Sequence, residues 1–227
     1  MVRPRDIGES REGASSLDLR HDASAFETGE ARAVFLDRDG TLSEDVGYAR
    51  EVAQYRLFPW TIPALRALRQ AGYRVIVLTN QSGVARGYFP ETLVQEVHRR
   101  FERELREHDA SWDAVYYCPH HPDGIVPAYR QACSCRKPAT GLVERAAREF
   151  ALDLRRCVFV GDKYTDIELA HRVGARGVLV LTGHGRQQWE QCRKEGWRPP
   201  DHVAENVWAA VQWILSHERE TERGATP

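Results

Sequence analysis

The sequence has no excess of basic residues and no long apolar run, and both absences narrow its function. Lysine and arginine together number 32, against 33 aspartate and glutamate residues in a chain of 227. This balance argues against a large nucleic-acid or anionic-membrane footprint. No apolar stretch approaches the roughly 20 residues that a membrane-spanning helix needs, and the start of the chain lacks the apolar core of a signal peptide. We therefore expect a cytoplasmic protein.

Two further absences concern disulfides and nucleotide binding. The chain has only five cysteines, and in the cytoplasm cysteines are more often thiols or metal ligands than disulfide partners. The sequence contains no Gly-x4-Gly-Lys-Ser/Thr phosphate loop, which argues against a kinase. It also contains no internal repeat, and its length and 42% hydrophobic content suffice for one domain with a sizeable core.

Composition divides the chain into three parts. Residues 1–30 carry Gly, Ser, Ala and mixed charges without a sustained apolar period, which predicts a flexible extension. Apolar segments and amphipathic stretches alternate over residues 31–216, which predicts a single domain. The charged segment 217–227 is predicted to be a fraying tail.

The alternation within this domain predicts an α/β fold. Five short segments rich in Val, Ile, Leu, Phe or Tyr predict strands at 33–37, 74–79, 114–117, 157–161 and 178–181. Apolar residues at helical spacing predict helices whose buried faces include Ile62, Val94, Leu142, Ile167 and Val207. Such alternation implies right-handed crossovers and a Rossmann-like parallel sheet with helices on both faces.

The run Ala33–Thr41 contains the most informative motif, two carboxylates placed two positions apart at the end of a predicted strand. Side chains at i and i+2 of an extended segment point the same way, so Asp37 and Asp39 both face the crevice where open α/β sheets bind ligands. We interpret Asp37 as a nucleophile and Asp39 as its acid/base partner, with Mg2+ nearby. The alternative is an Asx turn before Gly40 that closes an ordinary strand.

Three more polar loops follow predicted strands or precede helices. Thr79 ends the second strand, Arg136 and Lys137 form a pair of cations, and Asp162 follows the fourth strand as a candidate Mg2+ ligand. Asp166 lies one helical turn further on. Each loop alone also fits a simpler role, namely a cap, a solvated turn or a helix N-terminal charge.

Cys118-Pro-His120 and Cys133-Ser-Cys135 form a C-x-H…C-x-C pattern. Four such ligands in two tight pairs are typical of closed structural zinc sites. The intervening loop, 118–135, contains prolines and a glycine and has little core of its own, so that zinc would supply its order.

The four polar loops, in this order, resemble the haloacid-dehalogenase (HAD) superfamily of phosphatases. The resemblance implies that Asp37 forms an aspartyl-phosphate, while Thr79 and Lys137 stabilise the transferred phosphoryl group. It implies that Asp39 acts as acid and then base, which requires a raised pKa. The Mg2+ ligands would be the side chains of Asp37 and Asp162 and the backbone carbonyl of Asp39.

Six segments make the resemblance specific to one family within this superfamily. They are Asp37–Thr41, Asp45–Tyr48, Thr79–Gly83, Tyr117–Pro122, Cys133–Pro138 and Gly161–Lys163. Together they look like the D-glycero-D-manno-heptose 1,7-bisphosphate 7-phosphatase family from about Ala31 to Gly185. The family implies a HAD-like core without a large cap domain, a phosphorylated sugar as the binding partner, and removal of the 7-phosphate in nucleotide-activated heptose synthesis. By this resemblance the substrate contacts are Asp45, Val46, Gly47, Tyr48, Thr79, Asn80, Gln81, Ser82, Arg136, Lys137 and Lys163.

Two alternatives stay open. Histidinol-phosphate phosphatases share these motifs and differ around the leaving group: a carboxylate pocket would favour histidinol phosphate, and a second cationic pocket would favour the bisphosphate. The chain could also be a catalytically silent, zinc-stabilised interaction module. We expect a monomer.

Overall fold

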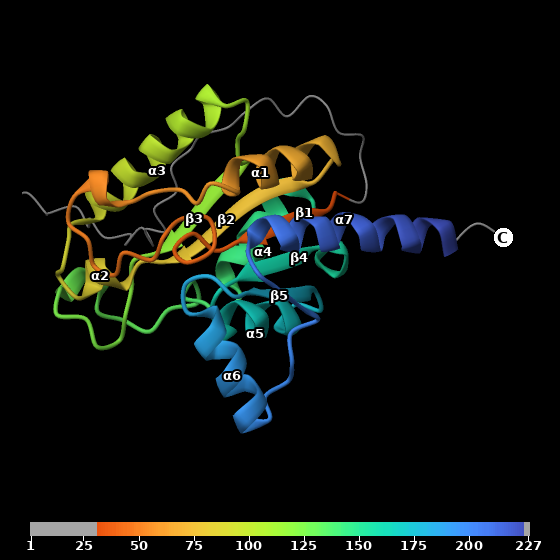
Figure 1. Ribbon diagram of the computed structural model, residues 1–227. Coiled ribbons are helices and arrows are strands. Elements are labelled where there is room, and N and C mark those ends of the chain that lie inside the picture. The colour runs from red at the N-terminus through yellow and green to blue at the C-terminus, as the bar shows by residue number, and fades with distance from the viewer. Residues whose placement is uncertain (1–30, 225–227) are drawn as a thin grey trace, which may run out of the picture.

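The structure, a computed structural model, describes residues 31–224 and centres on a parallel sheet of six strands (Figure 1). The sheet order is β3-β2-β1-β4-β5-β6, and every neighbouring pair is parallel. The strands are β1 (Ala33–Leu36), β2 (Arg74–Asn80), β3 (Ala114–Cys118), β4 (Val158–Gly161), β5 (Arg176–Val180) and β6 (His202–Ala204). The predicted parallel α/β sheet is confirmed, and each predicted strand is found within two residues of its expected ends.

Helices follow the strands in alternation. They are α1 (Thr61–Gln70), α2 (Ser82–Ala85), α3 (Glu91–Glu107), α4 (Gly141–Phe150), α5 (Tyr164–Arg172), α6 (Gly185–Glu195) and α7 (Val207–Gly224), with 3-10 turns at Val52–Gln54, Pro127–Tyr129 and Leu154–Arg156. Strand β6 was not predicted, because three residues are too few to give an apolar run. Helix α7 continues to Gly224, whereas a fraying tail was predicted from residue 217. The predicted extension 1–30 lies outside the described residues.

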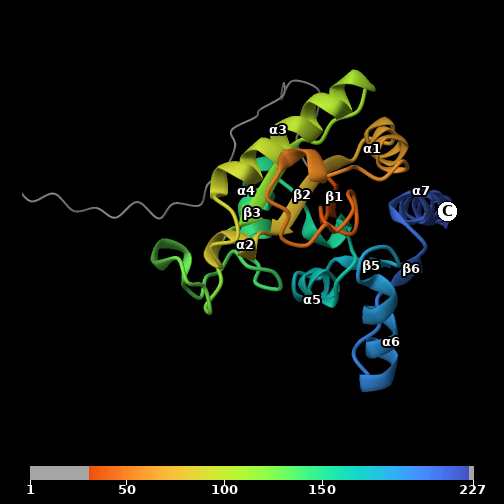
Figure 2. The same ribbon diagram turned by 60° about the vertical axis from the view of Figure 1, so that its left-hand side comes forward.

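Both faces of the sheet are covered because each strand buries alternate residues on opposite sides. Val34 and Leu36 of β1 belong to a core that α1, α3 and α7 cover, as Figures 1 and 2 show. Ala33 and Phe35 belong to a second core, beneath α4 and α5. There the Phe35 ring stacks on Phe159 of β4, with ring centroids 4.5 Å apart. This packing fixes β1 and β4 side by side at the centre of the sheet.

The strand order places a crevice between β1 and β4. The chain runs from β1 outward through β2 and β3, and then crosses back to β4 and outward through β5. Sheets with such a reversal bind ligands outside the carboxyl ends of their strands. In the described chain, only a 3-10 turn interrupts the loop between β1 and α1, and another the loop between β3 and α4. No large cap domain therefore stands over the crevice within residues 31–224.

No helix among the described residues combines the length and apolar character that crossing a membrane requires.

Candidate active site

Asp37 lies at the centre of the crevice, directly after β1. Its backbone N–H donates to Val160 O at 2.9 Å, so the ladder with β4 fixes the start of the loop. The side chain is 7% exposed. Its Oδ1 accepts from the backbone N–H of Arg38 at 2.8 Å and lies 2.9 Å from the Lys137 ammonium. The carboxylate is therefore held in a fixed orientation and paired with a cation.

Lys137 is a buried ammonium whose N–H groups find three acceptors. Nζ lies 2.9 Å from Asp37, 2.6 Å from Asp166 and 2.7 Å from the carbonyl oxygen of Leu78. Burial alone would lower the pKa of Lys137, but the charges of Asp166 and Asp37 outweigh it and raise the pKa. The backbone of Lys137 is held as well, because the Asn80 amide accepts from its N–H and donates to its carbonyl oxygen.

Asp162, after β4, is fully buried in a cradle formed by two glycines. A Cβ at Gly40 would lie 2.2 Å from Asp162 Oδ2, and one at Gly183 would lie 2.3 Å from it. Asp162 Oδ2 accepts from the backbone N–H of His184 at 2.8 Å, whereas Oδ1 is buried without a hydrogen-bond partner. Burial and the charge of Asp37 raise the pKa of Asp162 to about 8.

This arrangement fits a divalent cation. Carboxylate oxygens of Asp37, Asp162 and Asp166 lie within 4.8 Å of one another, and hard cations such as Mg2+ take oxygen ligands of this kind. The unpartnered Oδ1 of Asp162 and its raised pKa both indicate a charge that lacks compensation. The side chain of Asp39 is not in this group, and the contribution of its backbone carbonyl stays a prediction.

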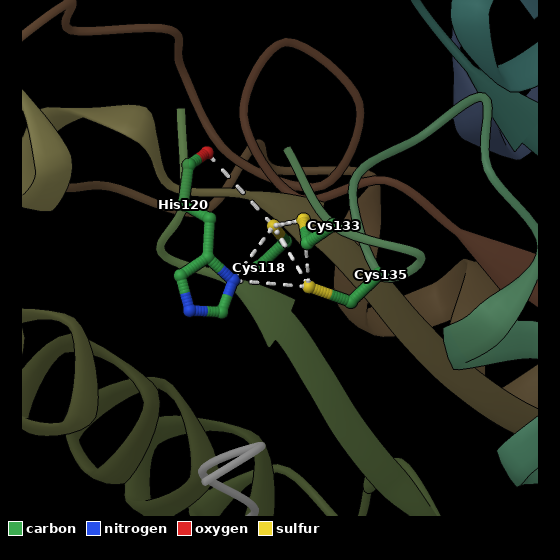
Figure 3. A group of neighbouring side chains, drawn as sticks. All are labelled: Cys118, His120, Cys133 and Cys135. Carbon is green, nitrogen blue, oxygen red and sulfur yellow. Dashed lines mark hydrogen bonds between the residues drawn. The ribbon is translucent and has the colours of Figure 1, made fainter. Parts of the chain in front are cut away.

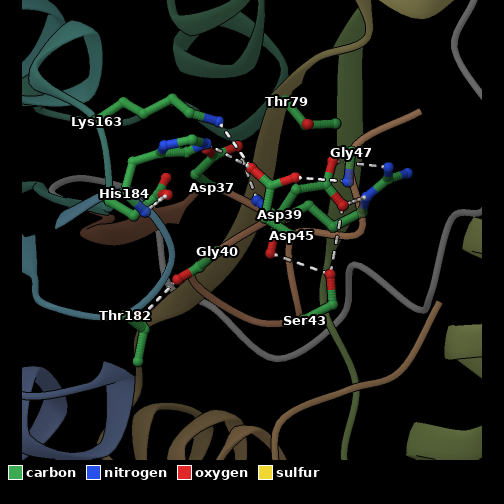
Figure 4. Close-up of polar contacts among 12 residues, drawn as sticks. Asp37, Asp39, Gly40, Ser43, Asp45, Gly47, Thr79, Lys163, Thr182 and His184 are labelled. Carbon is green, nitrogen blue, oxygen red and sulfur yellow. Dashed lines mark hydrogen bonds and ion pairs between the residues drawn. The ribbon is translucent and has the colours of Figure 1, made fainter. Parts of the chain in front are cut away.

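The Asp39 carboxylate is turned toward Arg38 and Gln81. Figure 4 shows Asp39 among Asp37, Ser43 and Thr79. Both its oxygens are bound by the Arg38 guanidinium, at 3.0 and 2.8 Å, and Gln81 Nε2 donates to Oδ2 at 2.8 Å. Burial would raise the pKa of Asp39, but the charge and hydrogen bonds of Arg38 and Gln81 lower it instead. The raised pKa expected of an acid is therefore wrong for this arrangement, because Arg38 stabilises the ionised form.

Gln81 connects two of the predicted motifs. Its Nε2 also donates to Thr79 Oγ1 at 2.9 Å, so the end of β2 is linked to the Asp39 loop. Gln81 and Asn80 were predicted to contact substrate. In this structure the amide of Gln81 bridges Thr79 and Asp39, and that of Asn80 holds the backbone of Lys137.

A second layer of charges lies beside Asp162. Asp45 accepts from the backbone N–H of Gly47, and its other oxygen lies 3.3 Å from Lys163 Nζ and 3.1 Å from His184 Nε2. Burial would lower the pKa of Lys163, but the charges of Asp162, Asp37 and Asp45 raise it. A cleft of about 360 Å³ opens here, lined by Glu44, Asp45, Gly47, Phe58, Gly183 and His184.

The remaining predicted substrate residues are partly or fully exposed. Tyr48 is 49% exposed, and its ring contacts that of Tyr88 with centroids 4.2 Å apart. Val46 packs against the core, and Ser82 is the half-buried first residue of α2. Arg136 is half-buried, with Nη1 3.5 Å from the carbonyl oxygen of His120.

Sequence reasoning missed the loop after β5. Thr182 Oγ1 donates to the carbonyl oxygen of Gly40 at 2.5 Å, Gly183 closes the cradle of Asp162 with φ +54, and His184 binds both Asp162 and Asp45. The signal was present, since Leu181-Thr-Gly-His-Gly185 also places small polar residues after an apolar strand. Arg38 and His98, which contact each other, were missed too.

The predicted zinc ligands form one cluster, which Figure 3 shows at the end of β3. The sulfur atoms of Cys118, Cys133 and Cys135 lie 3.1 to 3.5 Å apart, and His120 Nδ1 lies 3.3 Å from Cys135 Sγ. These cysteines are free thiols. The hydrogen bond with Cys118 lowers the pKa of Cys135 to about 5, and thiolates are the form that binds metal. The cluster is therefore compatible with zinc.

The cluster adjoins the cationic loop, because Cys135 directly precedes Arg136 and Lys137. The segment 118–135 is also tied to α3. There the Glu91 carboxylate accepts from the hydroxyls of Tyr117 and Tyr129 at 2.9 and 2.7 Å. The cysteine cluster thus joins the two ends of the segment 118–135, and Tyr129 ties its interior to α3.

Comparisons with known proteins agree with this geometry. The Hydrolase_like family model (HAD-hydrolase-like) matches residues 134–210. The D-glycero-D-manno-heptose-1,7-bisphosphate 7-phosphatase of Thermosynechococcus vestitus is 42% identical over 82% of this chain and 96% of its own length. The D-glycero-beta-D-manno-heptose-1,7-bisphosphate 7-phosphatase of Escherichia coli K12 is 41% identical over 81% and 88%.

A solved structure is similar as well. The D,D-heptose 1,7-bisphosphate phosphatase of B. bronchiseptica, complexed with magnesium and phosphate, superposes with a TM-score of 0.72 at 31% identity and covers 82% of this chain and 99% of that one. On these identities and coverages, the chain belongs to the D-glycero-D-manno-heptose-1,7-bisphosphate 7-phosphatase family of HAD-like hydrolases.

Proposed function

We propose that this protein is a Mg2+-dependent phosphatase that removes the 7-phosphate of D-glycero-D-manno-heptose 1,7-bisphosphate. One observation carries the proposal: Asp37, Lys137 and the incompletely bonded Asp162 meet in a single buried crevice. The family relationship supplies the substrate class. We assign the activity to the domain 31–216, and we infer a cytoplasmic monomer whose partner is the phosphorylated sugar.

The residues divide the reaction into two steps. An oxygen of Asp37 attacks phosphorus and the bond to the sugar O7 breaks. O7 leaves with a proton that Asp39 has taken from solvent water on turning away from Arg38. Water then attacks phosphorus of the aspartyl-phosphate, Asp39 takes the proton from that water, and the Asp37 carboxylate is restored as phosphate departs. Lys137 and Thr79 stabilise charge on the phosphoryl oxygens throughout.

The carboxylates of Asp37 and Asp162, with the backbone carbonyl of Asp39, would hold the magnesium ion. When bound, Mg2+ supplies positive charge that stabilises the transferred phosphoryl group. We do not count Asp166 among the magnesium ligands, because its Oδ1 binds Lys137 and its Oδ2 accepts from the backbone N–H of Lys163. Its role is to hold these two lysines.

The charges around the cleft favour the bisphosphate over histidinol phosphate. Glu44 and Asp45 line the cleft, as a pocket for an amino group would require. However, Asp45 already pairs with Lys163 and His184, which reduces its attraction for a second cation. Lys163 shares Asp45 with His184, and together with Arg136 it would supply the positive charge for a second phosphate. Carboxylate oxygens can also accept from the hydroxyls of a heptose.

We expect heptose 1,7-bisphosphate to be hydrolysed with a kcat/KM at least about tenfold above that for histidinol phosphate. Side-by-side steady-state kinetics with Mg2+, following phosphate release, provide the measurement. A reversed preference would assign the chain to the histidinol reaction instead. No hydrolysis of any sugar phosphate would favour the silent interaction module.

Asp37→Asn removes the nucleophile and keeps its shape. We expect kcat to fall by about 10³-fold or more, while the melting temperature stays close to that of the native protein, because an amide oxygen can still accept from Arg38 and Lys137. Asp109→Asn is the matched control: this exposed residue adopts φ 53, which asparagine tolerates, and its activity should be unchanged. Substantial turnover by Asp37→Asn would exclude Asp37 as nucleophile.

Magnesium should stabilise the protein more at pH 8.5 than at pH 6. The raised pKa of Asp162, about 8, means that the folded protein binds a proton there more tightly than the unfolded chain. The stability of the metal-free protein therefore falls as pH rises from about 4 to about 8. Mg2+ competes with this proton, so the rise in melting temperature on adding Mg2+ is expected to grow over the same range.

The control for this measurement is Asp162→Asn, which should lose most of the magnesium response at both pH values. Equal magnesium-induced shifts at pH 6 and pH 8.5 in the native protein would contradict the assignment of Asp162 as a ligand.

We propose zinc as the metal of the cysteine cluster, with a structural role. Cys133→Ser is expected to lower the zinc content and to raise KM about tenfold, while kcat changes less than about threefold. The reason is that Arg136 depends on the loop, whereas Lys137 is also held by Asn80 and Leu78. Elemental analysis and kinetics provide the measurement, with Cys192→Ser, a buried cysteine outside the cluster, as control. Native protein without zinc would contradict the proposal.

A further inference from the structure

The Asp39 carboxylate has almost no acceptor capacity left. Its Oδ1 accepts from Arg38 Nε at 3.0 Å and lies 3.4 Å from Ser43 Oγ, and its Oδ2 accepts from Arg38 Nη2 and Gln81 Nε2, both at 2.8 Å. A carboxylate offers about four lone-pair sites. The hydroxyl of Ser43 shares its single proton with the carbonyl oxygen of Arg38, 3.3 Å away. A leaving oxygen or a water thus finds no open site on Asp39 in this orientation.

Contacts with other residues hold the Arg38 side chain in place. Its side chain is 1% exposed, and Nη1 lies 2.9 Å from Nε2 of His98 on α3. The guanidinium also lies over the Tyr55 ring, 5.4 Å from its centroid. Because a guanidinium can only donate, Nε2 of His98 must accept, and the ring proton resides on Nδ1. Nδ1 is buried and has no hydrogen-bond partner among residues 31–224, so within this part of the chain the ring is hydrogen-bonded through Arg38.

From these contacts we infer that Arg38, anchored by His98, is a positioning residue that holds Asp39 in a resting orientation, from which the carboxylate turns to the departing sugar oxygen. Arg38 stays in place, while Asp39 replaces one of its two hydrogen bonds from the Arg38 guanidinium with a hydrogen bond to the substrate. The inference rests on the proposed phosphatase function and deepens it, since it assigns a task to Arg38 and His98, which have no part in the transfer of the phosphoryl group itself.

The anchor can be tested by a pair of substitutions at His98. His98→Leu removes the acceptor for Arg38 Nη1, and His98→Gln keeps an acceptor oxygen on a side chain of similar reach. The two variants are compared by rapid-mixing kinetics of the first turnover with heptose 1,7-bisphosphate and with p-nitrophenyl phosphate. The sugar oxygen needs a proton from Asp39 to depart, whereas nitrophenolate departs without one.

For His98→Leu we expect the first-turnover rate to fall about tenfold with heptose 1,7-bisphosphate, a part of the 10²–10⁴-fold that general acid catalysis supplies. With p-nitrophenyl phosphate it should fall less than twofold. His98→Gln should recover most of the loss, and KM for the sugar should stay within about twofold. Equal losses with both substrates would mean that His98 merely supports the fold around Asp37, and unchanged rates with both would also overturn the inference.

A second measurement needs no variant and decides the matter if His98→Leu does not fold. A crystal structure of the native protein with Mg2+ and orthovanadate should show Asp39 released from at least one nitrogen of Arg38 and turned toward an apical vanadate oxygen. The contact between Arg38 Nη1 and His98 Nε2 should remain. If Asp39 keeps all its present partners, or if Arg38 leaves His98, the inference is wrong.

The two proposals fail in different ways. If the native protein does not hydrolyse heptose 1,7-bisphosphate but does hydrolyse another alkyl phosphate, the substrate assignment is wrong, and the His98 comparison is then made with that alkyl phosphate. If the native protein hydrolyses heptose 1,7-bisphosphate and His98→Leu shows no selective loss, the substrate assignment stands and the role of Arg38 is wrong.

Discussion

The ion pair between Lys137 and Asp37 is the interaction on which the site depends. Three buried carboxylates, Asp37, Asp162 and Asp166, lie within 4.8 Å of one another, and buried like charges raise one another's pKa. The Lys137 ammonium compensates Asp37 and Asp166 at 2.9 and 2.6 Å. It leaves Asp162 with an unpartnered oxygen and a pKa of about 8. The fold thus supplies one cation and leaves space and charge for another.

The sheet makes this concentration of charge possible. Asp37 and Asp162 follow β1 and β4, which pair at the centre of the sheet and stack Phe35 on Phe159 beneath the site. A pair of buried strands cannot move apart without losing this packing, so the two carboxylates stay close despite their repulsion. Glycines at 40 and 183 are then required by space, because a Cβ at either position would overlap the Asp162 carboxylate.

Much of this arrangement could be predicted from the sequence, because polar residues that directly follow apolar strands must meet at one edge of a parallel sheet. Asp37, Thr79 and Asp162 have this property, and the four zinc ligands lie in two short, readable pairs. Contacts set by packing were not predictable. Arg38 meets His98 across 60 positions, and no periodicity indicates that pairing. The lowered pKa of Asp39 follows from its contacts with Arg38 and Gln81 and was missed as well.

The attachment of Lys137 separates catalysis from substrate recognition. Its ammonium binds the carbonyl oxygen of Leu78, and its backbone binds Asn80, so both anchors come from β2 rather than from the zinc loop. The Arg136 side chain, one residue earlier, reaches the carbonyl oxygen of His120 within that loop. A cation fixed to the sheet can keep its distance to Asp37 while the loop changes its shape. Variation in the zinc loop is therefore expected to alter which sugar phosphate is bound while the phosphoryl-transfer groups stay in place.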